Sequence, residues 1–191
     1  AIREICSPEF PGKSRLKAIR AVAGHEALKK AFAGCGNVVA TDMSPYAPAL
    51  YEADRHYIVP RMTAPGYLEV IFDICQKENI TGVLSLIDPE LALLAQNAQR
   101  FAQLGVTVIG SGYEACDLAF DKMKMYRWLS AHGYPCARSY TEREEFFKAV
   151  DSGSLTYPVF VKPVCGSASL SINRAADAET VNFLMDHGSD M

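Results

Sequence analysis

The sequence lacks the features that mark several common classes of protein. It contains no Gly-x-Gly-x-x-Gly run, so the glycine fingerprint of NAD- and FAD-binding proteins is absent. Its 191 residues carry a net charge of −3, whereas a nucleic-acid-binding domain normally shows a basic surface. No apolar run approaches the roughly 18–20 residues that a membrane-spanning helix needs. We therefore expect neither nucleic acid nor a membrane among its partners.

The cysteines and histidines form no familiar pattern. The six cysteines include no Cys-x-x-Cys pair, and the four histidines have no zinc-ligand spacing. There is also no Gly-x-Ser-x-Gly segment to mark a nucleophilic serine. With 49% hydrophobic residues the chain can build an ordinary core, so disulfides are not needed. These observations predict free thiols, a cytoplasmic location, no metal site and no identifiable catalytic nucleophile.

Strands and helices alternate through the first part of the chain. Short apolar runs predict strands, and helical spacing of apolar residues predicts the helices between them. The predicted strands are Asn37–Asp42, His56–Pro60, Gly82–Ile87 and Val106–Gly110, and the predicted helices are Arg15–Phe32, Pro65–Glu78 and Asp88–Leu104. Such alternation is typical of an α/β domain with a parallel sheet covered on both faces.

The pattern changes after a long predicted helix over Glu114–His132, which Gly133-Tyr134-Pro135 ends. The next predicted elements are a helix over Glu142–Asp151, a strand over Val159–Lys162, a hairpin partner over Ser169–Asn173 and a helix over Ala178–His187. Local hairpin pairing indicates a second, mixed or antiparallel unit that begins near Cys136.

The most informative segment is Tyr157–Lys162 with the loop that follows it. A β-branched and aromatic run places Lys162 at the end of a strand, and small residues follow from Cys165 to Ser169. A lysine supplies a point charge for a polyphosphate, and a small-residue backbone can approach it and donate N–H groups. The alternatives are a solvent-exposed lysine and a tight hairpin turn.

Three segments together resemble the ATP-grasp superfamily, in its branch similar to the large subunit of carbamoyl-phosphate synthase. The first runs from Asp42-Met43-Ser44-Pro45-Tyr46 to Val59-Pro60, and the second is Leu86-Ile87-Asp88-Pro89-Glu90-Leu91. The third comprises Asp121-Lys122, Gly133-Tyr134-Pro135 and Tyr157–Ser169. The resemblance covers roughly Gly36–Asn173 in this order and spacing.

The resemblance implies a fold and a domain organisation. It implies a Rossmann-like pre-ATP-grasp domain over residues 1–113, a linker helix over 114–135, and a truncated α+β first ATP-grasp lobe over 136–191. It also implies an ATP-dependent ligase that phosphorylates a small-molecule carboxylate and passes the acyl group to an amine or thiol. Related enzymes often pair, so a homodimer is one assembly that the resemblance suggests.

Residue by residue, the resemblance implies nucleotide contacts for Lys122 and Lys162. It also implies a phosphate-covering loop at Gly166, Ser167, Ala168 and Ser169, in which Cys165 and Ala168 stand where the family often has glycine. Asp42, Asp88 and Glu90 are candidates for substrate contacts, because ligands of open α/β sheets bind beyond the carboxyl ends of the strands. The Asp88-Pro89-Glu90 segment is typical of a helix start, which favours an N-cap role for Asp88 over a ligand role, although the two roles are compatible.

The implied cofactors are ATP and Mg²⁺, but the family's metal ligands and adenine hinge have no counterpart before Met191. We therefore expect the metal ligands outside this chain and no turnover by the chain alone. The alternative function is a non-catalytic, Rossmann-like module that binds a small molecule or a partner. A dinucleotide or nucleotide-sugar binder is disfavoured by the missing glycine fingerprint.

Overall fold

The structure is a computed structural model that describes residues 18–19, 36–166 and 171–188. The chain divides into two compact units, Ala1–Cys116 and Asp117–Met191.

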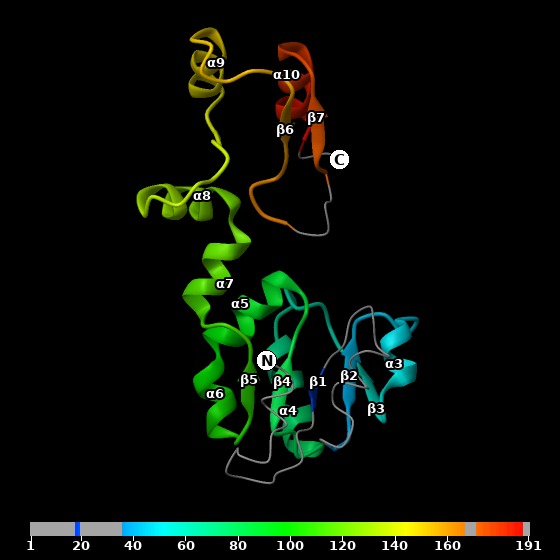
Figure 1. The fold of residues 1–191 in the computed structure, drawn as a ribbon. Helices are drawn as coiled ribbons and strands as arrows, with labels where there is room; N and C mark the ends of the chain where they lie inside the picture. Colours follow the sequence, from blue (N-terminus) through cyan, green and yellow to red (C-terminus); the bar gives the residue numbers. More distant parts are fainter. Residues whose placement is uncertain (1–17, 20–35, 167–170, 189–191) are drawn as a thin grey trace. The chain divides into compact units, whose positions relative to one another are not determined.

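The first unit is built on a five-stranded parallel sheet in the order β3-β2-β1-β4-β5 (Figure 1). Its strands are β1 (Ala18–Ile19), β2 (Val39–Asp42), β3 (Arg55–Ile58), β4 (Gly82–Leu84) and β5 (Thr107–Ile109). Its helices are α3 (Pro48–Glu52), α4 (Tyr67–Lys77), α5 (Asp88–Gln96) and α6 (Ala98–Gln103). Parallel neighbours require crossover connections; α3 supplies the one between β2 and β3, and α5 and α6 supply the one between β4 and β5. The predicted α/β class is confirmed.

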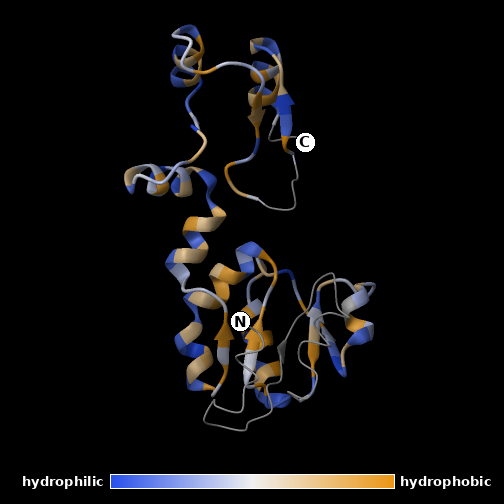
Figure 2. Cartoon of the chain, in the orientation of Figure 1, coloured by the Kyte–Doolittle hydropathy of each residue, from blue (hydrophilic) through white to orange (hydrophobic). Residues whose placement is uncertain are grey.

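An apolar cluster joins α4, α5 and α6 to this sheet. Figure 2 shows β4 and β5 coloured mostly hydrophobic, whereas the edge strand β3 is largely hydrophilic. Phe101 of α6 is fully buried, and its ring centroid lies 4.6 Å from that of Phe72 of α4. The buried members of the cluster are Val39, Val59, Tyr67, Ile71, Phe72, Ile74, Cys75, Ile80, Val83, Leu94, Phe101 and Val106.

Two predicted helices of this unit differ from the structure. The helix predicted over Arg15–Phe32 is wrong at Ala18–Ile19, which form the central strand; the rest of that range lies outside the described residues. Pairing with β2 and β4 there overrides the helical spacing of a short apolar run. The helix predicted over Asp88–Leu104 is interrupted at Asn97, whose Nδ2 donates to the carbonyl of Leu93 over 2.9 Å.

The remaining elements are α7 (Tyr113–Phe120), α8 (Lys122–Ala131), α9 (Arg143–Asp151), β6 (Val159–Val161), β7 (Asn173–Ala175) and α10 (Ala178–His187). Strands β6 and β7 form an antiparallel pair, so the predicted hairpin is confirmed. Its second strand begins at Asn173 rather than Ser169, and residues 167–170 lie outside the described ranges.

The core of the second unit is smaller than that of the first. The buried members of its apolar cluster are Phe146 of α9, Ala175 of β7, and Val181 and Leu184 of α10, and Ala149 of α9 is also buried. Half-buried Val159 and Val161 of β6 pack against them. Figure 2 shows β7 as mainly hydrophilic, which agrees with a ribbon that has only one face in the core.

Candidate functional site

The β6–β7 ribbon has one covered face and one open face. Direct pairing joins Val159 to Ala175, Phe160 to Arg174 and Val161 to Asn173. Side chains of paired residues share a face and alternate along each strand. Ala175 is buried, whereas the Phe160 side chain is 69% exposed and Arg174 is exposed. The open face therefore carries Phe160 beside Arg174.

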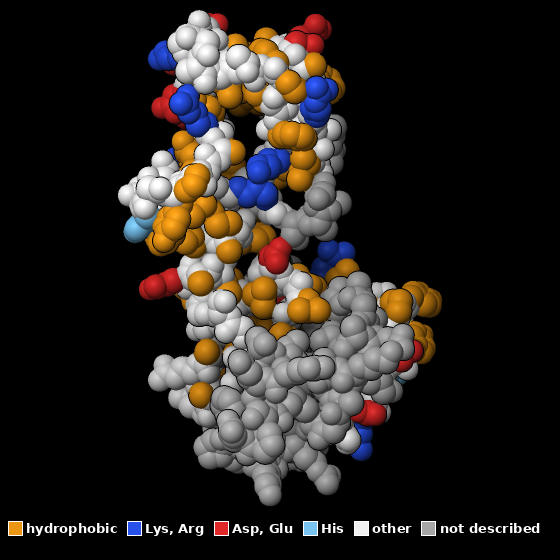
Figure 3. All heavy atoms as spheres, viewed as in Figure 1, with side chains coloured by type: hydrophobic (Ala, Val, Ile, Leu, Met, Phe, Trp, Pro, Cys, Tyr) orange, Lys and Arg blue, Asp and Glu red, His pale blue; other side chains and the backbone are white. Residues whose placement is uncertain are grey.

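Lys162 follows β6 directly and is exposed, as is Ile172, which precedes β7. Continued alternation puts both residues on the open face, with the two cations on one diagonal and the two apolar residues on the other. Within the described part of the chain, neither Lys162 nor Arg174 has an ion-pair partner. In Figure 3, basic side chains lie among hydrophobic ones on the visible face of the second unit.

Lys122 is fixed to the segment that follows Lys162. Its Nζ donates to the carbonyl of Gly166 over 2.8 Å and to that of Val164 over 3.4 Å. Its backbone N–H donates to the same Val164 carbonyl over 3.0 Å. Gly166 has φ +123°, a conformation that favours glycine. The structure thus brings Lys122 together with Gly166, while Ser167, Ala168 and Ser169 lie outside the described residues.

Asp121, at the break between α7 and α8, also contacts the segment that follows Lys162. Asp121 has an extended backbone and forms an isolated antiparallel bridge with Cys165. Its Oδ1 accepts from the backbone N–H groups of Met123 (2.9 Å) and Lys124 (2.8 Å), so it is the N-cap of α8. The single helix predicted over Glu114–His132 is therefore wrong at Asp121. Capping and pairing at that residue divide the helix in two.

Asp42 and Asp88 lie at the carboxyl-terminal edge of the parallel sheet, as expected. Asp42 ends β2, and its Oδ1 accepts from the backbone N–H of Ser44 over 2.9 Å. Asp88 is the first residue of α5, because Ile87 occupies the N-cap position. The N-cap role predicted for Asp88 is therefore wrong. The turn before α5 is instead held by Ser85, whose Oγ accepts from the Ile87 backbone N–H over 3.1 Å. Both carboxylates are half-buried.

The third acidic candidate, Glu90, lies in the core. Its side chain is 1% exposed, and its carboxylate accepts hydrogen bonds from the hydroxyls of Tyr67 and Ser85. A ligand could reach this carboxylate only if these groups moved. The geometry therefore gives Glu90 a structural role, because it holds Ser85, which in turn holds the turn before Asp88.

Three residues with a role in this geometry were not predicted from the sequence: two lie on the open face of the ribbon and one in the first unit. Phe160 could have been found by counting two residues back from Lys162 along a strand. Arg174 depends on the register between β6 and β7, which no local pattern shows. Glu78 is 5% exposed and accepts from Arg55 Nη1 at 3.0 Å and from the Tyr57 hydroxyl, so it locks β3 to the end of α4.

The cysteines inside the described ranges are free thiols, as predicted: Cys75, Cys116, Cys136 and Cys165. Burial raises the pKa of the Cys75 thiol to about 12, whereas Cys136 and Cys165 are exposed. Among the described residues, no three His, Cys, Asp or Glu side chains gather to hold a metal ion. Nor does any described helix combine the length and apolarity needed to cross a membrane.

Comparison with known proteins shows which families and structures this chain is similar to. The family described as PylC-like, N-terminal domain, matches residues 17–109. The arginine-specific large chain of carbamoyl phosphate synthase from Bacillus subtilis (strain 168) is 29% identical over 114 residues, 58% of this chain and 10% of its own length. A D-alanine–D-alanine ligase from Macrococcus caseolyticus (strain JCSC5402) is 30% identical over 88 residues, 42% of this chain and 25% of its own length.

The chain is similar to the amino-terminal region of ATP-grasp, carbamoyl-phosphate-synthase-like proteins. It spans only a tenth to a quarter of the length of these relatives. Solved ATP-grasp structures share its fold. An N5-carboxyaminoimidazole ribonucleotide synthetase in complex with ADP matches with a TM-score of 0.66 and 14% identity, over 90% of this chain and 43% of the other.

The biotin carboxylase domain of Hydrogenobacter thermophilus 2-oxoglutarate carboxylase, solved as a dimer with MgADP and bicarbonate, gives a TM-score of 0.64 at 18% identity. That match covers 91% of this chain and 40% of the other chain. These identities carry the fold alone. The predicted architecture, a Rossmann-like parallel sheet followed by a partial α+β ATP-grasp lobe, is confirmed.

Proposed function

We propose that this chain belongs to an ATP-dependent carboxylate ligase and supplies part of its nucleotide-binding surface. The observation that carries the proposal is the open face of the β6–β7 ribbon, where Lys162 and Arg174 lie exposed without an acidic partner among the described residues. Exposed cations beside an apolar ring suit a molecule that joins a polyphosphate to a flat base. Relatives with a ligase name and ATP-grasp structures with bound ADP support this assignment.

In this proposal Lys162 binds the phosphates directly. Lys122 stands at the base of the loop, where its ammonium group already holds the Gly166 carbonyl and has a further N–H for an anion. Ser167, Ala168 and Ser169 complete the loop. We assign residues 1–113 as the pre-ATP-grasp domain, 114–135 as the linker and 136–191 as the first lobe, with Asp42 and Asp88 on the substrate side.

The proposed reaction proceeds through an acyl phosphate. A carboxylate oxygen of the substrate attacks the γ-phosphorus of ATP, and ADP leaves. An amine or thiol then attacks the acyl carbon, and phosphate leaves. The residues around Lys162 offer ammonium and backbone groups rather than the carboxylate oxygens that Mg²⁺ prefers. These residues therefore do not fit a magnesium site.

A homodimer and a cytoplasmic location are part of the same proposal. The Hydrogenobacter thermophilus domain was solved as a dimer, and free thiols are typical of a reducing compartment.

Calorimetry with MgATP tests the site. We expect Lys162→Ala to weaken binding by about tenfold or more, equivalent to about 1.4 kcal/mol. Lys148→Ala is the matched control, since Lys148 is an exposed lysine of α9 away from the ribbon face. Equal MgATP affinity for Lys162→Ala and the unaltered protein would show that the site is wrongly assigned. No measurable MgATP binding by either would favour the alternative, a non-catalytic binding module.

A further inference from the structure

The chain reverses direction at the end of helix α8, and a hollow lies beside the helix there. The backbone N–H of Tyr134 donates to the Leu129 carbonyl over 3.0 Å, and that of Gly133 donates to the Ser130 carbonyl over 3.2 Å. This pair of bonds is a Schellman motif, and Gly133 has the left-handed φ of +73° that the motif requires. The chain after Pro135 therefore runs back past the helix.

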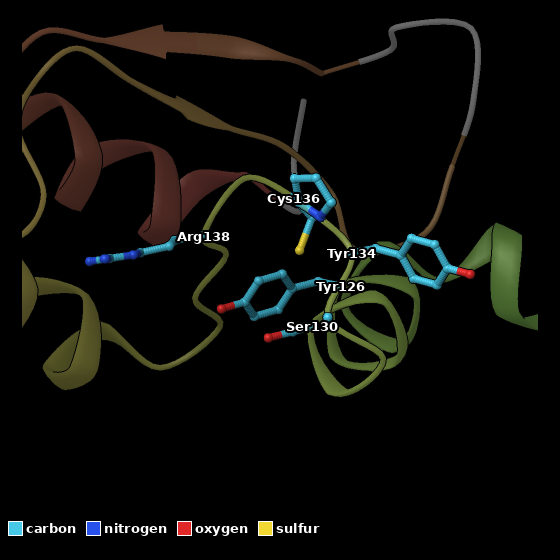
Figure 4. Close-up of a pocket in the computed structure, with 7 residues that line it drawn as sticks. Tyr126, Ser130, Tyr134, Cys136 and Arg138 are labelled. Atoms are coloured by element: carbon cyan, nitrogen blue, oxygen red, sulfur yellow. The ribbon is translucent and has the colours of Figure 1, made fainter.

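The hollow holds a pocket of about 410 Å³, within the range of small-molecule sites. Tyr126 and Ser130, four residues apart on one face of α8, form one wall. Tyr134, Pro135, Cys136 and Arg138 form the other. In Figure 4, the hydroxyls of Tyr126 and Ser130 and the guanidinium of Arg138 point to the same side, while the Cys136 sulfur points toward the Tyr126 ring.

Arg138 is the one charged side chain of this lining. It has a single hydrogen bond in the described part of the chain, from Nη1 to the Ser154 carbonyl over 3.2 Å, and no acidic partner there. A guanidinium has five N–H donors in a planar fork, which matches a carboxylate. One cation with two neutral hydroxyls fits a ligand with one negative charge, and the Tyr126 ring offers an apolar wall to its body.

We propose that this pocket binds a small organic monocarboxylate with a flat apolar body. Arg138 pairs with the carboxylate, Tyr126 and Ser130 donate hydrogen bonds, and the ligand body lies against the Tyr126 ring and the Cys136 side chain. The site is independent of the nucleotide surface around Lys162, so either assignment can fail without the other.

Alkylation of Cys136 can report ligand binding in the pocket, because its exposed thiol lies in the lining. Iodoacetate and iodoacetamide both alkylate a thiolate: the sulfur bonds to the reagent's methylene carbon and iodide leaves. Only iodoacetate carries a carboxylate. The ratio of the two rates at Cys136, measured by peptide mass spectrometry, therefore reports carboxylate recognition and cancels any change in thiolate fraction.

We expect Arg138→Gln to lower this ratio at Cys136 by about tenfold, the loss of one charge-assisted hydrogen bond. Arg127→Gln is the control: Arg127 is an exposed arginine of α8 outside the lining, and its loss should leave the ratio within about twofold. Benzoate should slow the reaction of Cys136 with iodoacetamide in the unaltered protein, and the neutral analogue benzamide should not.

Three results would overturn the proposal: an unchanged ratio in Arg138→Gln, an equal fall in Arg127→Gln, or equal effects of benzoate and benzamide. Cys75 reports the folding of the first unit in the same digest, because its buried thiol has a pKa raised to about 12 and stays unlabelled while that unit is folded. Should Arg138→Gln unfold the second unit, seen in the Trp128 fluorescence, Arg138→Lys replaces it. That variant keeps the charge without the fork, and an unchanged ratio would also contradict the proposal.

Discussion

The two units of the molecule treat charged side chains differently. In the first, Glu78 and Glu90 are 5% and 1% exposed, and each accepts hydrogen bonds from neighbouring side chains. In the second, Lys162 and Arg174 are exposed and have no acidic partner among the described residues. A buried, bonded carboxylate fixes the architecture, whereas an exposed, unpaired cation is free to meet a ligand. In the first unit these charged side chains stabilise the fold, whereas in the second unit they are exposed and available to a ligand.

The difference extends to the cores. Among the described residues, the first unit has a large buried cluster that links the sheet to α4, α5 and α6, and the cluster of the second unit has four buried members around a two-stranded ribbon. A larger core gives a greater margin of stability. We therefore expect the loss of a buried apolar side chain to cost more unfolding free energy in the first unit than in the second.

The largest expected effect is that of Phe101→Ala in the first unit. Phe101 is fully buried against Phe72, so its loss should cost about 3–5 kcal/mol of unfolding free energy. Leu184→Ala removes a 7% exposed side chain from the smaller core and should cost about 2 kcal/mol. Urea unfolding measures both, with Cys75 labelling for the first unit and fluorescence of the single tryptophan, Trp128, for the second. A larger loss for Leu184→Ala would contradict the comparison of the cores.

A smaller effect is expected from Glu90→Gln, which keeps the shape of the side chain and removes its charge. The amide has one acceptor oxygen where the carboxylate has two, so the hydroxyls of Tyr67 and Ser85 can no longer both donate as they do now. Loss of a buried hydrogen bond to a charged group costs about 1.5–3 kcal/mol. Asp88→Asn is the control, since Asp88 is half-buried in the same turn. If Glu90→Gln unfolds at the same urea concentration as the control, the structural role assigned to Glu90 is wrong.

Part of the fold and of the candidate site could be predicted from the sequence. Features set by neighbouring residues were predicted, whereas features set by contacts between residues distant in sequence were not. The bounds of α10 were predicted correctly, because Asp177 as N-cap and the helical spacing of Val181 and Leu184 are local signals. The central strand at Ala18–Ile19 was missed, because its partners lie on β2 and β4. The break at Asp121 and the burial of Glu90 likewise depend on residues distant in sequence, Cys165 and Tyr67.

The smallest expected effect concerns Asp177, an exposed carboxylate of the second unit that contrasts with buried Glu90 of the first. Hydrogen bonds from the Thr180 hydroxyl (2.6 Å) and backbone N–H (2.8 Å) lower the pKa of Asp177 below its ordinary value of 3.8. Because the pKa is depressed on folding, the stabilisation is fully present above pH 3.8 and is lost as the pH falls through the folded-state value. The Thr180 side chain is the main cause of this shift. Thr180→Val should therefore raise the pKa of Asp177 toward 3.8, as followed by NMR titration of its carboxyl carbon. An unchanged titration in that variant would mean that the cap does not hold the charge, and that the second unit gains no acid-sensitive stability at this helix.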